Sequence, residues 1–163
     1  MMKIRFSAVA ALAGVVLVWG AHTAVQAAEA TPNYLGDYCW TLTITDTTVS
    51  DLQVGATFIL RFGVTYMGGS YYSLQGIATF ANDGPYVVAG SGVLQGSTIH
   101  LAASGGQDHV PYTTWRDTSK LMMALDASTL NGTFYDIGSD FNTSSRAFDT
   151  RYTAGNAILT SCP

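Results

Sequence analysis

The segment YCWTLTIT, residues 38–45, alternates large apolar side chains with cysteine and threonine. Successive side chains of a β-strand point to opposite faces of its sheet, so this alternation predicts a strand with one apolar and one polar face. The apolar face would carry Tyr38, Trp40, Leu42 and Ile44. Cys39 would lie on the other face among threonines. The segment contains no second cysteine, so a disulfide partner for Cys39 must come from elsewhere in the chain.

The same period of two recurs along most of the chain after this segment. Residues 54–66, VGATFILRFGVTY, and residues 70–80, SYYSLQGIATF, alternate in this way on either side of a Gly-Gly pair typical of hairpin turns. Turns are also predicted at residues 81–85, 95–97, 127–129 and 154–157, and the longest loop at residues 104–118. No long stretch has the capped spacing of an amphipathic helix, although residues 121–128 could form one or two helical turns.

This pattern predicts about eight to ten short strands, nearly all joined by hairpin-sized turns. Short sequential connections favour a meander, and closure of the sheet removes exposed strand edges. The predicted fold class is therefore all-β: an antiparallel up-and-down β-barrel of about eight strands, closed by a disulfide between the first and last strands.

The chain begins with the features of an export signal. A positively charged start, MMKIR, precedes an apolar run at residues 6–21 and the small-residue sequence VQA at 25–27. We predict that residues 1–27 are a signal peptide cleaved near Ala27, and that residues 28–163 form a single β-barrel domain in a secreted or periplasmic protein. The alternative is an uncleaved membrane anchor.

The chain has two cysteines, Cys39 and Cys162. An even pair in an exported chain predicts a disulfide, since neither cysteine has the C-x-x-C spacing or the neighbouring histidine of a redox or metal site. In a closed barrel the last strand returns beside the first. The pair should therefore fasten the seam between these strands, on the outer side of the barrel, with Cα atoms within about 7 Å.

The alternating faces allow a soluble barrel with an apolar interior or a membrane barrel with an apolar exterior. The polar faces carry mostly Thr, Ser and Gly with few paired charges, many predicted strands are short or interrupted by glycine, and the chain ends in SCP rather than an aromatic strand end. These features favour the soluble barrel.

A resemblance accompanies this layout. Gly36 and Trp40 in GDYCW (36–40), followed by repeated hairpins, resemble the calycin group of lipocalins, fatty-acid-binding proteins and avidins, although the lipocalin G-x-W spacing is shorter by two residues. FDTRY (148–152) is similar to the late lipocalin segment with its closing arginine. The resemblance implies that Arg151 covers the barrel end near Trp40, and that the barrel holds a small, largely apolar ligand.

The candidate ligand-binding residues are aromatic side chains and one methionine expected on the inward face, with a lid at the barrel mouth. The inward set is Tyr38, Trp40, Phe58, Phe62, Tyr72, Met123, Phe134 and Phe148, and the lid in the 104–118 loop is Tyr112 and Trp115. The same aromatics could simply fill the core. The small residues expected to face them, Ala56, Gly76, Ala78, Gly90 and Gly92, could leave a slot or interlock with large neighbours.

Other chemistry has little support in the sequence. The net charge is −4 and no basic run occurs, so we expect no nucleic-acid partner. His100 is expected to face outward and His109 to lie in a loop beside Asp108, so we expect no metal or cofactor. Asp136 and Asp140 flank IGS, which is interpreted as turn chemistry rather than a catalytic pair.

The sequence thus favours a secreted protein that holds a small hydrophobic or amphipathic ligand inside a β-barrel. The alternatives are a surface or assembly module whose sheet edges pair with partners, and a barrel-supported isomerase or cyclase for which no catalytic residue can be named. The oligomeric state stays open.

Overall fold

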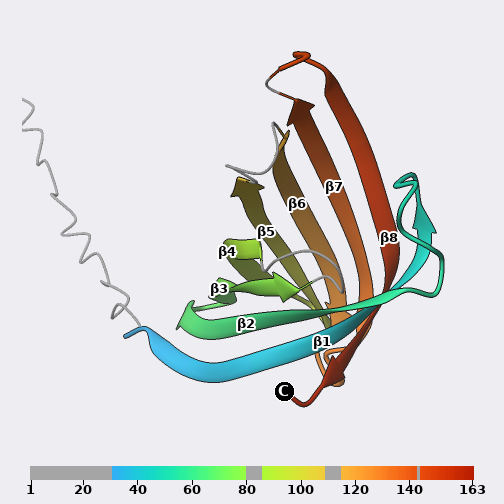
Figure 1. The fold of residues 1–163 in the computed structure, drawn as a ribbon. Helices are drawn as coiled ribbons and strands as arrows, with labels where there is room; N and C mark the ends of the chain where they lie inside the picture. Colours follow the sequence, from blue (N-terminus) through green and yellow to red (C-terminus); the bar gives the residue numbers. More distant parts are fainter. Residues whose placement is uncertain (1–30, 80–85, 109–114, 143) are drawn as a thin grey trace, which may run out of the picture.

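The computed structural model describes residues 31–79, 86–108, 115–142 and 144–163, which form a closed barrel (Figure 1). Its eight strands are β1 (Asn33–Thr47), β2 (Thr57–Gly68), β3 (Tyr71–Thr79), β4 (Tyr86–Gln95), β5 (Thr98–Asp108), β6 (Trp115–Asp126), β7 (Gly132–Asn142) and β8 (Phe148–Thr160). Each strand pairs antiparallel with the next, and β8 pairs with β1. The predicted all-β, up-and-down barrel of eight strands is confirmed.

The described residues contain no helix long and apolar enough to cross a membrane. Residues 121–126, for which helical turns were an alternative, belong to β6, and a turn follows at residues 127–129. The turn predicted at residues 127–129 is therefore confirmed, and it joins β6 to β7 as an antiparallel hairpin.

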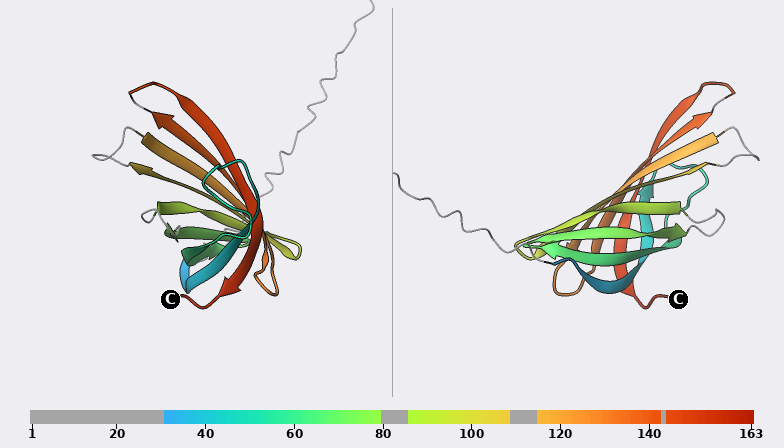
Figure 2. Two further views of the ribbon diagram at one scale, coloured as in Figure 1. Left: turned by 45° about the vertical axis from the view of Figure 1, so that its right-hand side comes forward. Right: turned by 90° about the vertical axis from the view of Figure 1, so that its left-hand side faces the viewer.

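The barrel has two different ends. β1, β3, β5 and β7 finish at one rim, which we call the loop end; the turns at residues 69–70, 96–97 and 127–131, the start of β1 and the end of β8 lie at the other, which we call the turn end. Both views in Figure 2 show the strands diverging toward the loop end. A side chain's position along its strand therefore decides which end of the interior it reaches.

The core occupies the inside of the barrel. The inward face predicted for β1 is confirmed, because Trp40 is only 2% exposed and Leu42 and Ile44 are also buried. β2 contributes Phe58 and Phe62 to the same core. Burying an aliphatic or aromatic side chain contributes about 1.5–3 kcal/mol, so this inward row supplies much of the barrel's stability.

Small residues on the inward face interlock with large ones in the middle of the barrel. A Cβ atom added at Gly76 would lie 2.8 Å from Cδ1 of Phe62, and one added at Gly92 would lie 2.6 Å from Cδ2 of Leu101. The rings and aliphatic groups thus occupy the space that the glycines leave. At Gly76 and Gly92 the interlocking alternative therefore holds, whereas Ala78 lines a cavity.

The predicted disulfide joins Cys39 to Cys162, with Cα atoms 5.1 Å apart. Cys39 alternates with the inward Trp40 and pairs with Thr160, the last residue of β8. Cys162 follows two residues later, so the bond fastens the β1–β8 seam at the turn end. A disulfide is compatible with an extracellular or periplasmic location.

Two predicted interruptions of strands are wrong. β8 runs without a break through the turn predicted at 154–157, because Gly155 lets the strand approach β1: a Cβ there would lie 1.9 Å from the Thr43 carbonyl oxygen. Both ends of the predicted 104–118 loop belong to β5 and β6, and residues 109–114 lie outside the described residues. Its alternation was hidden because Gly105, Asp117 and Ser119 take inward positions that apolar residues occupy elsewhere.

Candidate functional site

An apolar cavity of about 230 Å³ lies inside the turn end, and we call it the turn-end cup. Its lining includes Tyr38, Trp40, Tyr72, Leu101 and Leu130. Tyr38 stacks on Trp40 with ring centroids 6.2 Å apart. Apart from the tyrosine hydroxyls and the indole N–H, the side chains of this cup carry no hydrogen-bonding group, so it suits an apolar ligand.

The wall of the turn-end cup is held in place by the β6–β7 turn. The Trp40 indole nitrogen donates a hydrogen bond to the Leu130 carbonyl oxygen at 2.8 Å. Leu130 has a φ of 58°, an uncommon conformation for a residue of this type. Asp126 caps the turn by accepting hydrogen bonds from the backbone N–H groups of Ser128 and Thr129 at 2.9 and 3.0 Å. The indole donor of Trp40 is therefore already used by the protein.

A layer of buried side chains separates this cup from the loop end. Phe62 packs edge-on against Trp40, with ring centroids 6.4 Å apart. Further along the axis, Phe58 meets Phe134 edge-on at 5.5 Å. Met123 is also buried in this layer. The interior is thus filled in the middle and hollow toward both ends.

A second cavity of about 160 Å³ lies inside the loop end, and we call it the loop-end pocket. Its apolar surface comes from Phe58, Val88 and Leu121. Its polar surface includes Asp117, Ser119, Asp136, Arg151 and Thr153. The pocket therefore combines an apolar surface with charged side chains, which the lining of the turn-end cup lacks.

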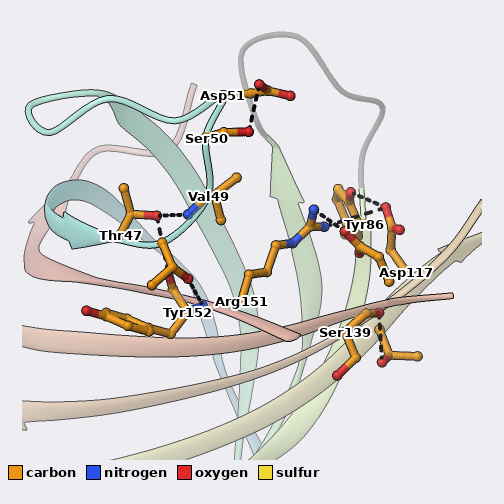
Figure 3. A network of polar contacts seen from close by, with 12 residues as sticks. Thr47, Val49, Ser50, Asp51, Tyr86, Asp117, Ser139, Arg151 and Tyr152 are labelled. Carbon is orange, nitrogen blue, oxygen red and sulfur yellow. Dashed lines mark hydrogen bonds and ion pairs between the residues drawn. The ribbon is translucent and has the colours of Figure 1, made fainter. Parts of the chain in front are cut away.

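Arg151 organises the polar wall of the loop-end pocket. Its guanidinium forms an ion pair with Asp140 and lies 3.9 Å from Oδ2 of Asp117. Tyr86 donates a hydrogen bond to the same Asp117 oxygen at 3.3 Å. Figure 3 shows the arginine side chain reaching from β8 toward Tyr86 and Asp117. Gly138, opposite Arg151 in the β7–β8 ladder, leaves room for this side chain, because a Cβ there would lie 3.1 Å from its Nε.

The β1–β2 connection forms one side of this pocket. Val49, Asp51 and Leu52 belong to its lining. The connection is tied to β8, because the Thr48 N–H donates to the Tyr152 carbonyl oxygen at 3.0 Å and the Thr47 hydroxyl bonds the same oxygen at 3.1 Å. This side of the loop-end pocket is therefore held to β8 by hydrogen bonds as well as by packing.

Two aspartates of the loop end are unusually weak acids. Burial raises the pKa of Asp136, although Ser119 donates a hydrogen bond to it and Arg151 acts in the opposite direction. Burial, followed by the influence of Asp117, raises the pKa of Asp140 to about 6. Asp140 is 8% exposed, and its Oδ1 has no hydrogen-bond partner among the described residues.

The raised pKa of Asp140 predicts a measurable effect of pH on stability. Between its ordinary value of 3.8 and about 6, the folded protein retains a proton that the unfolded chain releases, so this group's contribution to stability falls as pH rises through that window. Asparagine resembles the protonated acid. At pH 7.5 the Asp140→Asn variant should be about 1 kcal/mol more stable than the parent, and at pH 4 equally stable. Thermal denaturation at both pH values measures this, and a less stable variant at pH 7.5 would contradict it.

The predicted ligand-binding residues divide among several places. Tyr38, Trp40 and Tyr72 line the turn-end cup, and Phe58 lines the loop-end pocket. Phe62, Met123 and Phe134 are buried between the two cavities. The side chains of Tyr112 and Trp115 lie outside the part of the chain that the structure describes, as does the whole of His109.

The inward position expected for Phe148 is wrong, because this residue is 66% exposed. It pairs with Phe141 at the loop end, and both belong to outward rows of β7 and β8. The expected covering of the Trp40 end by Arg151 is also wrong. Trp40 pairs with Leu159, eight residues further along β8, so about 27 Å of strand separates the two positions.

The ionisable groups of the loop-end pocket were missed by the sequence reasoning. Asp136 and Asp140 were interpreted as turn residues, but they lie within β7 and face the interior. The sequence did contain a signal for this, because Asp136 and Asp140 lie an even number of residues from the inward Phe134 and so share its face of the strand. Among the described residues, no group of acids, histidines or cysteines could hold a metal ion, and His100 is exposed as expected.

A third hollow, of about 430 Å³, lies on the outside of β1, β2 and β3. Its charged groups already satisfy one another, since Arg61 donates to Asp37 at 3.1 Å and Tyr34 bonds the other oxygen of the same carboxylate. We therefore regard the two interior cavities as the candidate sites. Comparisons of the chain with family models, curated proteins and solved structures found no match.

Proposed function

We propose that this protein is a calycin-like binding protein whose turn-end cup holds a small hydrophobic or amphipathic molecule. The observation that carries the proposal is the cup itself, about 230 Å³ of apolar space beside the filled middle of the barrel. Protein interiors are normally packed to a density that leaves few such voids. An apolar surface left open in a rigid barrel gains free energy when an apolar ligand covers it.

The size of the cup limits the ligand. A cavity of about 150 Å³ holds one benzene ring, so the cup accommodates a single ring system or a short alkyl chain. The stacked rings of Tyr38 and Trp40 offer a flat surface to such a group. An export signal and a disulfide would place this binding outside the cytoplasm, where we propose that the protein acts.

A fluorinated aromatic probe tests this function. We expect 4-fluorotoluene to bind and to broaden and shift its ¹⁹F resonance in the presence of the protein. Ala127 lines the cup, so the Ala127→Phe variant should fill the space and weaken binding at least about tenfold. The matched control is Ala89→Phe, at an exposed position on the outside of β4, which should leave binding unchanged.

Native mass spectrometry of the freshly purified protein adds a second measurement, because a resident ligand would be detected as additional mass. The proposal fails if the probe does not bind and nothing copurifies. It also fails if the two phenylalanine variants weaken binding equally, since the probe would then associate with the barrel nonspecifically.

A further inference from the structure

The loop-end pocket has an excess of negative charge. Asp117, Asp136 and Asp140 all belong to inward rows of β6 and β7, and Asp117 and Asp140 lie directly opposite each other in the β6–β7 ladder. Among the described residues, Arg151 forms an ion pair with Asp140 and lies near Asp117, whereas Asp136 accepts a hydrogen bond from the neutral Ser119. Like charges held close together in a partly buried site repel, so an added positive charge would be favourable there.

One carboxylate oxygen of this cluster is buried without a hydrogen-bond donor, although its carboxylate forms an ion pair with Arg151. Asp140 is 92% buried, because only 8% of its surface is exposed, yet its Oδ1 accepts no hydrogen bond from any described residue. A buried acceptor without a donor costs about 1–3 kcal/mol, or more when the group is charged. Asp140 is not part of the pocket lining, so its negative charge acts on a bound ligand through space rather than by contact.

The same pocket provides an apolar surface next to these acids. Phe58, Val88 and Leu121 line it, and Phe58 packs against the buried core through Phe134. The volume of about 160 Å³ corresponds to one ring-sized group. The ligand that complements this pocket is therefore small, apolar on one side and positively charged on the other.

We propose that the loop-end pocket is a second binding site, which takes a small organic cation: a protonated amine carried on an apolar group the size of one ring. The ammonium group donates hydrogen bonds to Asp136, which lines the pocket, and the apolar group covers Phe58, Val88 and Leu121. Asp140 favours the ammonium group through its negative charge rather than by direct contact. This ligand class differs from that of the turn-end cup, whose lining includes no aspartate, glutamate, histidine, lysine or arginine.

An organic anion fits the pocket less well. Its partner would be Arg151, whose guanidinium is already engaged by Asp140 and lies near Asp117. An anion would also bring a further negative charge beside Asp136. An amine needs no such rearrangement, because it leaves the arginine pair in place.

Three ring-sized probes of different charge test the proposal. Benzylamine, benzyl alcohol and benzoate are titrated into the mature protein at pH 7.5 and low salt, with binding followed by calorimetry and by NMR shifts of the protein. We expect benzylamine to bind at least about tenfold more tightly than benzyl alcohol, and benzoate to bind more weakly than either. Shifts should concentrate at the loop end of β6, β7 and β8.

Asp136→Asn is the decisive variant. Asparagine keeps the shape of the side chain and an acceptor for Ser119, and burial already favours the neutral form of this acid, so the barrel should fold. We expect benzylamine binding to weaken at least about tenfold, with benzyl alcohol unaffected. Asp37→Asn removes the same charge on the outer face and should change nothing.

The pH dependence provides an independent readout. Benzylamine stays positively charged between pH 7.5 and pH 5, whereas Asp140, whose pKa is about 6, takes up a proton over the same range. The loss of this negative charge should weaken the binding of benzylamine to the protein several-fold. The ionisable groups that face Asp140 from β4, β6, β7 and β8 are Tyr86, Asp117, Asp136, Asp149 and Arg151.

Ala127→Phe separates this site from the turn-end cup, because it should abolish 4-fluorotoluene binding and leave benzylamine binding intact. The proposal is overturned if benzoate binds as tightly as benzylamine, or if Asp136→Asn has no effect. It is equally overturned if Ala127→Phe removes benzylamine binding, which would place the amine in the cup.

Discussion

The Cys39→Ala/Cys162→Ala double variant is expected to lose about 3–5 kcal/mol of unfolding free energy. The bond joins residues 123 positions apart, so it removes a large amount of conformational entropy from the unfolded chain. Among the strands that the structure describes, β1 and β8 are the only neighbours distant in the sequence, and the bond fastens this pair. In the absence of the bond, this seam depends on the hydrogen-bonded ladder and on the core alone.

Guanidinium chloride denaturation followed by circular dichroism measures this loss. The parent protein in reducing agent is the control, because reduction removes the bond without changing any other side chain, and it should unfold at the same denaturant concentration as the double variant. A loss below about 1 kcal/mol would contradict the prediction and would mean that the unfolded chain is already compact without the disulfide.

The Gly155→Ala variant is expected to lose about 3 kcal/mol or more, a large effect for the addition of one methyl group. The new Cβ would lie 1.9 Å from the Thr43 carbonyl oxygen and 2.8 Å from Cε1 of Phe134. The first neighbour is backbone of β1 and cannot turn away, so the seam between β1 and β8 would have to widen. The ring of Phe134 would also have to leave its contact with Phe58.

Gly63→Ala is the matched control for this substitution. Gly63 is also a strand glycine, on the outer face of β2, and an added Cβ there would have its nearest neighbours at 3.4 and 3.5 Å, which is ordinary contact. Its effect should remain within about 0.5 kcal/mol. Equal midpoints of chemical denaturation for the two variants would show that the barrel absorbs the contact at Gly155 by a small shift.

The turn end of the barrel could be predicted from the sequence because local and global preferences agree there. In β1 the contrast between Trp40 or Leu42 and the threonines matches the contrast between the core and the outer surface. The same agreement placed Tyr38 and Tyr72 on the inward face, where they line the cup. Period-two alternation is reliable wherever the interior is apolar.

The loop end could not be predicted in this way because its interior is polar. Asp117, Ser119 and Asp136 occupy inward positions, so hydrophobicity no longer alternates along β6 and β7. The position of Arg151 depends on the register between β1 and β8, which no local pattern reveals. The filling of the middle likewise depends on a distant pair, such as Phe62 over Gly76.

The covalent topology of the domain follows from the bond between Cys39 and Cys162. Peptide bonds and this disulfide together make residues 39–162 a ring. A protease that cuts one strand connection opens the ring but releases no fragment, and all eight strands stay in one molecule held by the remaining hairpins and the seam. Two cuts are needed before a piece can leave. In the oxidised state, a single cut in the exposed β1–β2 connection therefore leaves all eight strands in one molecule.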